Sequence, residues 1–397
     1  MAAGIAVGLF SGSAAAAESE AAHVRVAAAL LEEIVQNALP ATITLPRELG
    51  EGGDKTFQMT ALRYCGAGEK GNGRFRAAGR LGVGEPRREP AFAADEVCRP
   101  GLAELAEHAQ PAFAEGTVLV DLEATWKPWE LKLSAVRAVV TIENGRPRPL
   151  SGLDKRMELL SVPSADLRID IPAGATVVLH TMPTFLESAV EVAIVLADKA
   201  PAKPPRAAAG AREALLAGQA NLGAAIPAAF ANQVLRLLTG SQPLTIPVDR
   251  DEVDIQNVVL TGEGTGDAAR LTLTGNATPR SVRETMRWTL AAGGEPLRMS
   301  SVRVTAQFED CAGLGTMAAL GCNVRNGARA AAAEGFGQAL TQRYEGQLVH
   351  ELVSPLSLRF GIAGQRIELR GDLVRTAFSA RGLSAAAHLN SYSPRSR

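Results

Sequence analysis

The sequence has few aromatic residues and almost no net charge. Aromatic residues make up 4% of the 397 residues, with three Trp and three Tyr, and 41 Lys and Arg nearly balance 42 Asp and Glu. Proteins that bind nucleic acids use a basic surface and aromatic stacking platforms. This composition argues against a nucleic-acid partner. Hydrophobic residues at 46% and charged residues at 21% are instead typical of a folded chain.

Long apolar runs and catalytic signatures are also missing. No stretch reaches the ~18 apolar residues that a membrane-spanning helix needs, so we expect a protein that does not span the membrane. There is no P-loop and no GxSxG, and His350-Glu351 lacks the second histidine of HExxH because Ser354 stands there. The five histidines are scattered singly. We expect no enzymatic activity, no cofactor and no resident metal.

One glycine pattern resembles a nucleotide-binding motif. Gly66, Gly68 and Gly71 satisfy GxGxxG, but a dinucleotide fingerprint must open a helix. Residues 74–83 alternate like a strand instead. The pattern therefore predicts a hairpin turn, in which glycine supplies positive φ.

An acidic cluster offers possible calcium ligands. Its members are Asp249, Asp251, Glu252 and Asp254. The spacing matches no known calcium loop, so we favour a solvated loop.

The first 17 residues have features of an export signal. An apolar stretch from Gly4 to Phe10 precedes the small-residue run from Ala14 to Ala17. No Lys or Arg precedes Arg25, so the usual basic segment is missing. The alternative is a disordered Ala-rich start. We expect residues 1–17 to be a signal peptide and the mature protein to be periplasmic or secreted.

Cysteine usage agrees with an oxidising compartment. The four cysteines fall two per half, at Cys65, Cys98, Cys311 and Cys322. Three pairings are possible, and we favour 65–98 with 311–322 because each bond then closes a loop within one half. Closing the longer loop contributes roughly 3 to 4 kcal/mol in the chain-entropy model. A zinc site is the alternative, but the spacing contains no CxxC and no His lies nearby.

Residues 57–80 and 253–276 align without a gap. Apolar and glycine positions recur at an offset of 196, as in Phe57 and Val253 or Gly79 and Gly275. Apolar alternation slips by one residue after Met59, and the same slip follows Ile255. Such a slip indicates a β-bulge. The pattern predicts an internal repeat.

Each matched segment follows an amphipathic helix and a short strand ending at proline. The strands are Thr44-Leu45-Pro46 and Thr245-Ile246-Pro247. The apolar helix positions are Leu30, Leu31, Ile34, Val35 and Ala38 in the first half, and Ile226, Phe230, Val234, Leu237 and Leu238 in the second.

Strand-like runs continue in both halves, and a second helix is expected at 102–113 in the first and 336–352 in the second. A Pro-rich and Ala-rich stretch marks the boundary. We predict units at 24–200 and 213–390, a linker at 201–212 and a disordered tail at 391–397.

The order helix, short Leu-Thr-Ile-Pro strand at 244–247, then two long strands joined by a Gly-rich turn resembles the tubular lipid-binding (TULIP) superfamily, bacterial periplasmic type. The resemblance implies an α+β fold of two tandem units, each a long curved antiparallel β-sheet wrapped around amphipathic helices. It also implies an apolar groove that carries or senses a lipid or other apolar small molecule.

The candidate ligand-binding residues lie on the expected inner faces: Ile34, Val35, Phe57, Met59 and Phe75 in the first half, and Phe230, Val234, Val253, Ile255 and Leu271 in the second. These residues equally suit a filled core. The function implied is an exported lipid-binding carrier or sensor of the bacterial envelope. The alternative is a non-enzymatic structural or interaction protein with solidly packed sheets and an envelope protein partner. A hydrolase or transferase would need converging polar residues, and the sequence shows no such set.

Overall fold

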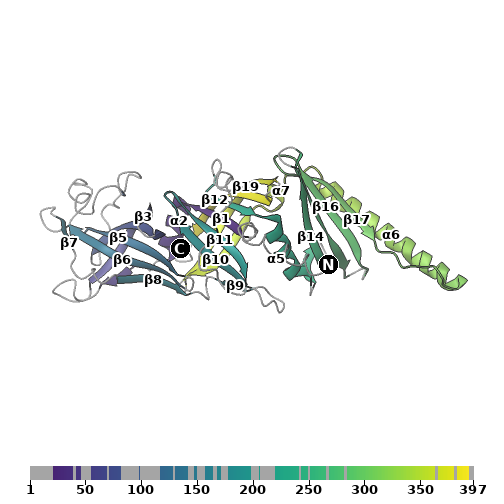
Figure 1. Ribbon diagram of the computed structural model, residues 1–397, viewed down its shortest axis with the longest axis horizontal. Helices are drawn as coiled ribbons and strands as arrows, with labels where there is room; N and C mark the ends of the chain where they lie inside the picture. The colour runs from purple at the N-terminus through teal and green to yellow at the C-terminus, as the bar shows by residue number, and fades with distance from the viewer. Residues whose placement is uncertain are drawn as a thin grey trace, which may run out of the picture.

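The computed structural model describes residues 21–38, 42–45, 55–68, 71–81, 98, 117–127, 130–141, 147–149, 157–163, 168–170, 178–197, 205, 220–240, 243–248, 251–264, 268–280, 284–362, 365–379 and 382–392. Within these ranges the fold is α+β and dominated by sheets, and every strand pair is antiparallel. Three sheets follow one another along the long axis of an elongated molecule (Figure 1).

The middle sheet has eight strands in the order β18-β19-β20-β12-β1-β11-β10-β9. The strands are β1 (Ala22–Ala27), β9 (Arg168–Asp170), β10 (Val178–Phe185), β11 (Ala189–Ala197), β12 (Leu222–Ile226), β18 (Leu356–Ile362), β19 (Gln365–Ser379) and β20 (Gly382–Tyr392). At its centre β1 pairs with β12, and His23 lies opposite Ala225. One sheet therefore contains strands from both halves of the chain.

A seven-stranded sheet lies at one end of the molecule and a five-stranded sheet towards the other (Figure 1). The first contains β2 (Thr42–Leu45), β3 (Lys55–Ala67), β4 (Gly73–Leu81), β5 (Thr117–Lys127), β6 (Glu130–Thr141) and β7 (Pro147–Pro149), and β8 (Met157–Pro163) also pairs with β6. The second contains β13 (Leu244–Val248), β14 (Asp251–Glu263), β15 (Arg270–Pro279), β16 (Met286–Gly293) and β17 (Arg298–Ala306).

The helices among the described residues are α2 (Ala28–Ala38), α5 (Ala228–Thr239), α6 (Thr316–Tyr344) and α7 (Val349–Leu352). Both α2 and α5 start directly after a central strand, β1 or β12, which the sequence pattern did not reveal. Ile226, expected on the helix, lies in β12, and Pro227 separates it from α5. Proline suits this position because the first helical N–H groups have no partner within the helix.

The helix expected at 336–352 has different limits. Its apolar stripe belongs to the 29-residue helix α6, which ends at Tyr344. Gly346 then adopts a φ of +81°, and Leu348 forms a bridge with Arg298. The residues after Tyr344 are therefore held by the sheet, and only the short α7 resumes helical structure.

Both expected β-bulges are confirmed. The register of β3 against β4 shifts between Met59 and Ala61, and that of β14 against β15 shifts between Gln256 and Val259. Asn257, within the second bulge, has a φ of +52°, a region that Asn enters more readily than most residues. The apolar alternation slips because the extra residue turns the following side chains back to the same face.

The glycine pattern forms a turn, as predicted. β3 and β4 pair antiparallel on either side of it, and the Gly68 N–H donates to the Asn72 carbonyl oxygen at 2.6 Å. Gly66 and Gly71 both have positive φ. No helix follows the glycines, so the motif is not a dinucleotide fingerprint.

The proline expected to end the short strand of the second half lies inside it. β13 continues through Pro247 to Val248. Proline is tolerated there because β13 is the edge strand, and a missing N–H costs little on an open edge.

The main core joins the two halves. Helix α2 packs on β3 and also on β19 and β20. The buried cluster includes Leu30 from α2, Phe75 from β4 and Leu389 from β20. Tyr64 connects the seven-stranded sheet to the middle sheet, because its hydroxyl donates to the Leu186 carbonyl oxygen at 2.6 Å.

Several expectations fall wholly or mostly outside the described residues: the signal peptide at 1–17, the helix at 102–113 and all of the linker except Pro205. β20 extends through Tyr392, so Ser391 and Tyr392 belong to the sheet and not to the tail expected at 391–397.

Both predicted disulfides are present. Cys65 pairs with Cys98, with their Cα atoms 5.3 Å apart, and Cys311 pairs with Cys322 at 5.9 Å. Among the helices described, none is long and apolar enough to cross a membrane.

Candidate ligand-binding site

The five-stranded sheet has one apolar and one polar face. Side chains alternate between the two faces along each strand, and cross-strand pairs such as Leu273 with Leu290 share one face. The apolar positions of that face are Val253, Ile255, Val258 and Leu260 on β14, Leu271, Leu273 and Ala277 on β15, Met286, Trp288, Leu290 and Ala292 on β16, and Met299, Val302 and Val304 on β17. The opposite face carries residues such as Thr272, Arg287 and Arg303.

Helix α5 covers one side of the apolar face, over β14. Asn232 donates from Nδ2 to the Leu260 carbonyl oxygen at 2.7 Å, and its Oδ1 accepts the Leu260 N–H at 2.7 Å. Thr239 Oγ1 accepts the Val258 N–H at 3.1 Å. β13 pairs with β14 only as far as Ile255, so beyond that residue this edge of β14 has no described strand neighbour. Side chains of α5 bond to the backbone there instead, which fixes α5 on the strand.

The C-terminal part of α6 covers the other side, over β17. Ala333 is buried against Met286 and Val304, and Phe336 and Leu340 pack beside it. Gly337 allows the close approach, since a Cβ there would lie 3.3 Å from the Val304 nitrogen.

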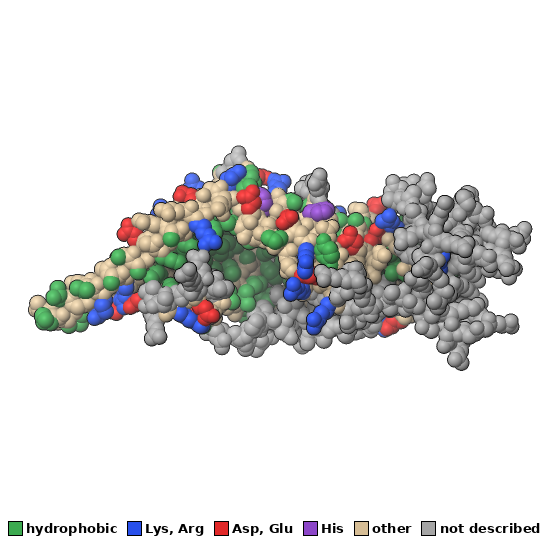
Figure 2. Space-filling view, turned by 180° about the vertical axis from the view of Figure 1, so that it is seen from behind, with side chains coloured by type: hydrophobic (Ala, Val, Ile, Leu, Met, Phe, Trp, Pro, Cys, Tyr) green, Lys and Arg blue, Asp and Glu red, His purple; other side chains and the backbone are tan. Residues whose placement is uncertain are grey.

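The apolar face between the two helices is only partly covered. Leu273, Trp288 and Leu290, on the two middle strands, are half-buried and not fully packed. From the helices, Leu235 and Phe336 are also only partly buried. Figure 2 shows a hollow with hydrophobic side chains inside it, between α6 and the middle of the molecule.

Trp288 is the one residue of this face that carries a polar group on a large apolar body. Its ring lies against Gly275, where a Cβ would stand 2.9 Å from the indole. The indole Nε1–H is shielded from solvent and has no hydrogen-bond partner among the described residues. A buried indole N–H ordinarily finds a partner, and here the nitrogen lies against Gly275, 3.0 Å from where its Cβ would be.

From Val253 onward, the apolar face has no ionisable side chain among its described positions. None of these positions on β14 to β17 is Asp, Glu, His, Lys or Arg. Such a surface excludes charged ligands, because burying an unpaired charge is costly, and it favours hydrocarbon.

The structure separates the candidate residues of the second half into two groups. Phe230, Val253 and Leu271 are almost completely buried and act as packing residues. Val234 and Ile255 are half-buried.

The candidates of the first half lie around the shared core. Phe75 is buried, and Ile34, Val35 and Met59 pack against the same cluster with partial exposure. The backbone of Phe57 pairs with Ile43 and Leu81, and its side chain lies outside what is described.

Sequence reasoning missed the partly buried apolar residues of the two middle strands. Leu273 lies two positions beyond the candidate Leu271, on the same face of β15, and Trp288 and Leu290 lie on the neighbouring strand. The period-2 alternation of these strands was visible in the sequence. The sequence did not show which part of each strand the helices leave uncovered.

The acidic cluster is engaged by an arginine. Arg280 pairs with Glu252, and its Nη2 lies 3.6 Å from Asp254 Oδ1. Asp254 Oδ1 also accepts a hydrogen bond from Thr245 Oγ1 at 2.7 Å. No cluster of metal-ligating side chains occurs in the described part of the chain.

No protein family model matches the sequence, and no curated protein matches it. Among solved structures, the chain is similar to P47 of Clostridium botulinum E1, with a TM-score of 0.34 and 8% identity over 94% of this chain and 99% of that one. P47 from Clostridium botulinum A2 gives a TM-score of 0.31 and 9% identity over 94% and 98%. A lipopolysaccharide binding protein gives 0.24 and 9% over 93% and 98%.

Proposed function

We propose that this protein binds a lipid or another apolar small molecule in the hollow between α5 and α6. The observation that carries the proposal is the incomplete burial of Leu273, Trp288 and Leu290 on an apolar face without ionisable groups. Covering such surface with an acyl chain contributes about 0.8 kcal/mol per buried methylene. A sheet with helices along two sides and an apolar floor suits an elongated ligand.

The protein acts as a non-enzymatic carrier or sensor outside the cytoplasm, in a TULIP-like arrangement. Its two disulfides support an oxidising compartment, since such bonds persist in secreted and periplasmic proteins. The absence of ionisable side chains on the apolar face favours binding over catalysis.

The two halves are copies of one strand–helix–sheet unit. In both, a central strand leads into a helix, and the first long strand that follows it in a flanking sheet has a bulge at the matched position. A helix side chain accepts the backbone N–H just after each bulge, Glu32 from Tyr64 at 2.8 Å and Asn232 from Leu260 at 2.7 Å.

Lipid extraction tests the proposed function. Protein purified from its native source is extracted with organic solvent and analysed by mass spectrometry, and stoichiometric lipid is expected. The purified chain is then titrated with a fluorescent fatty acid in a Trp126→Phe, Trp129→Phe background, which leaves Trp288 as the sole tryptophan. Saturable energy transfer from Trp288 is expected.

A pair of variants locates the site. Leu290→Glu places a carboxylate on the apolar face and is expected to abolish the saturable transfer. Thr289→Glu is the matched control, because Thr289 lies on the opposite face beside Arg303, and it is expected to bind normally. Equal binding by both variants, or no saturable binding by the parent, would favour the alternative of a solidly packed interaction protein.

A further inference from the structure

The N-terminal end of α6 projects past the five-stranded sheet at one extremity of the long axis (Figure 1). The packing contacts of α6 come from its C-terminal half, including Ala333, Phe336 and Leu340. The 29-residue helix is about 43 Å long at 1.5 Å per residue. We define the tip as residues 308–324, which comprise the loop after β17 and the first turns of α6.

The tip exposes an unusual concentration of large hydrophobic side chains. They are Phe308 (64% exposed), Leu314 (46%), Met317 (81%), Leu320 (60%) and Val324 (65%). Figure 2 shows hydrophobic side chains at this end of the long helix. Singly exposed apolar residues are normal, but a cluster on a protruding element marks an interaction surface.

Most of the tip is uncharged. Glu309 and Asp310 are its only charged residues, every residue from Cys311 to Val324 is uncharged, and small residues, mostly Gly and Ala, fill the positions between the large side chains. Placing this segment in hydrocarbon therefore desolvates no ionic group.

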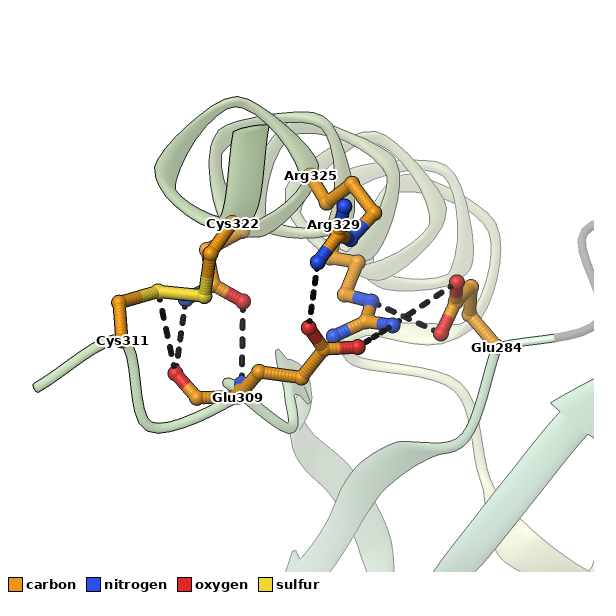
Figure 3. A network of polar contacts seen from close by, with 7 residues as sticks. Glu284, Glu309, Cys311, Cys322, Arg325 and Arg329 are labelled. Atoms are coloured by element: carbon orange, nitrogen blue, oxygen red, sulfur yellow. Dashed lines mark hydrogen bonds and ion pairs between the residues drawn. A yellow bond between two sulfur atoms is a disulfide. The ribbon is translucent and has the colours of Figure 1, made fainter. Parts of the chain in front are cut away.

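The shape of the tip is fixed before any partner binds (Figure 3). The Cys311–Cys322 disulfide ties the loop to α6. Below it, Glu309 accepts hydrogen bonds from Arg325 at 3.0 Å and Arg329 at 2.8 Å. Arg329 Nε lies 2.8 Å from Glu284 Oε2, which links the base of the tip to the start of β16. Hydrogen bonds from both arginines hold the pKa of Glu309 below its ordinary value, so this network stays ionised at neutral pH.

We propose that the tip docks on a lipid bilayer by inserting Met317, Leu320 and their apolar neighbours into the interface. A protein partner would need a complementary pocket for this narrow convex end, whereas a bilayer deforms around it. Arg325 lies eight residues after Met317, about 12 Å along the helix. The charged network therefore lies at the depth of the headgroups, where ion pairs remain hydrated, while the uncharged segment enters the acyl region.

This proposal is independent of a ligand in the hollow, and it predicts a particular salt response. Because the inserted surface is uncharged and its base carries internally paired charges, docking on phosphatidylcholine vesicles is expected to persist in 0.5 M salt. Adding phosphatidylglycerol to the vesicles is expected to change it little. Electrostatic surface binding would instead weaken steeply with salt.

Vesicle co-sedimentation of the full chain tests the proposal. The double variant Met317→Asp, Leu320→Asp is expected to lower the partition coefficient on phosphatidylcholine vesicles at least about tenfold. The matched control is Val353→Asp, Val374→Asp, since both valines are exposed to 48% and 42% but lie outside the tip. It is expected to partition like the parent. All four side chains are exposed, and unchanged thermal midpoints verify folding.

Fluorescence gives the second measurement. A Met317→Trp probe is expected to shift to the blue and to be quenched by brominated phosphatidylcholine, whereas a Val353→Trp probe is expected to do neither. Leu290→Glu, the variant of the hollow, is expected to keep vesicle binding. This result would separate membrane docking from ligand binding in the hollow. No partitioning by the parent, equal loss in the control, or tip-dependent dimerisation without vesicle binding would overturn the proposal.

Discussion

The side chain of Asn232 on α5 makes two hydrogen bonds with the backbone of a single residue, Leu260 on β14. It donates to the Leu260 carbonyl oxygen and accepts the Leu260 N–H, both at 2.7 Å. Leu260 lies beyond Ile255, the last residue of β14 that pairs with β13. The helix that forms one wall of the proposed site is thus fixed by an amide that replaces a strand partner.

Replacing Asn232 by Ala is expected to destabilise the protein by about 1 to 3 kcal/mol, because a buried N–H and a carbonyl oxygen lose their partners. Urea unfolding followed by circular dichroism measures the change. Gln342→Ala, at an exposed position of α6, is the control and is expected to lie within about 0.5 kcal/mol of the parent. A similar loss of unfolding free energy in both variants would mean that the Asn232 hydrogen bonds do not stabilise the protein.

The ring of Phe378 on β19 packs directly over Gly262 on β14, where an added Cβ would overlap it. Gly262→Ala is therefore expected to cost about 1 to 3 kcal/mol through overpacking. Phe378→Leu replaces the ring that causes the overlap by a smaller side chain. The double variant is therefore expected to be more stable than the sum of the two single losses predicts. Strict additivity in a double-mutant cycle would contradict the contact.

Glu368 should contribute to acid sensitivity. Hydrogen bonds from Arg370, Arg359 and Ser357 lower its pKa from 4.5 to about 2. Because the folded-state pKa lies below the unfolded one, the stabilisation is fully present above about pH 4.5 and is lost as the pH falls towards 2. Comparing the thermal midpoints of the parent and Glu368→Gln at pH 7 and pH 3 measures this. The difference in thermal midpoint between the two proteins is expected to be smaller at pH 3 than at pH 7. An equal difference at both pH values would mean that the Glu368 carboxylate does not contribute to acid sensitivity.

The two disulfides should differ in how much they contribute to the unfolding free energy. Cys65–Cys98 spans 33 positions and Cys311–Cys322 spans 11. The chain-entropy model gives about 3.7 and about 2.8 kcal/mol respectively. Replacing each pair by serine is expected to reduce the unfolding free energy in that order. Thiol labelling of the unreduced, unfolded parent is expected to find no reactive cysteine, and any stoichiometric labelling would contradict the pairing.

Asn257 provides a test of the bulge itself. Its φ of +52° is strained for a β-branched residue, so Asn257→Val is expected to cost about 1 to 2 kcal/mol. Asn257→Gly is expected to be close to neutral, since glycine adopts this conformation without steric cost. The exposed side chain makes packing losses small. Urea unfolding of both variants measures the difference in unfolding free energy. Equal losses in the two variants would mean that the positive φ of residue 257 is not the cause of the destabilisation.

Local features were predictable from the sequence because their causes are local. The bulges after Met59 and Ile255 appear as slips in apolar alternation, and the turn at Gly66 to Gly71 requires residues that tolerate positive φ. The cysteine pairing followed from position within each half.

The errors arose where neighbours distant in sequence decide. β1 and β12 are short and weakly patterned, and they become strands because each pairs on both sides within the middle sheet. The chain leaves α6 at Tyr344 because the following residues bond to β17, as in the Gly346 N–H donating to the Met299 carbonyl oxygen at 2.8 Å.

The sequence by itself determined the alternation, the bulges, the turn and the disulfide pairs, all of which depend on the preferences and spacing of nearby residues. Only the tertiary structure decided that the two halves share a sheet and a core, and that α5 and α6 leave Leu273, Trp288 and Leu290 partly uncovered. An apolar strand position has the same pattern whether a helix covers it or not. Its exposure is set by where the helices pack, and that depends on contacts between residues far apart in the chain.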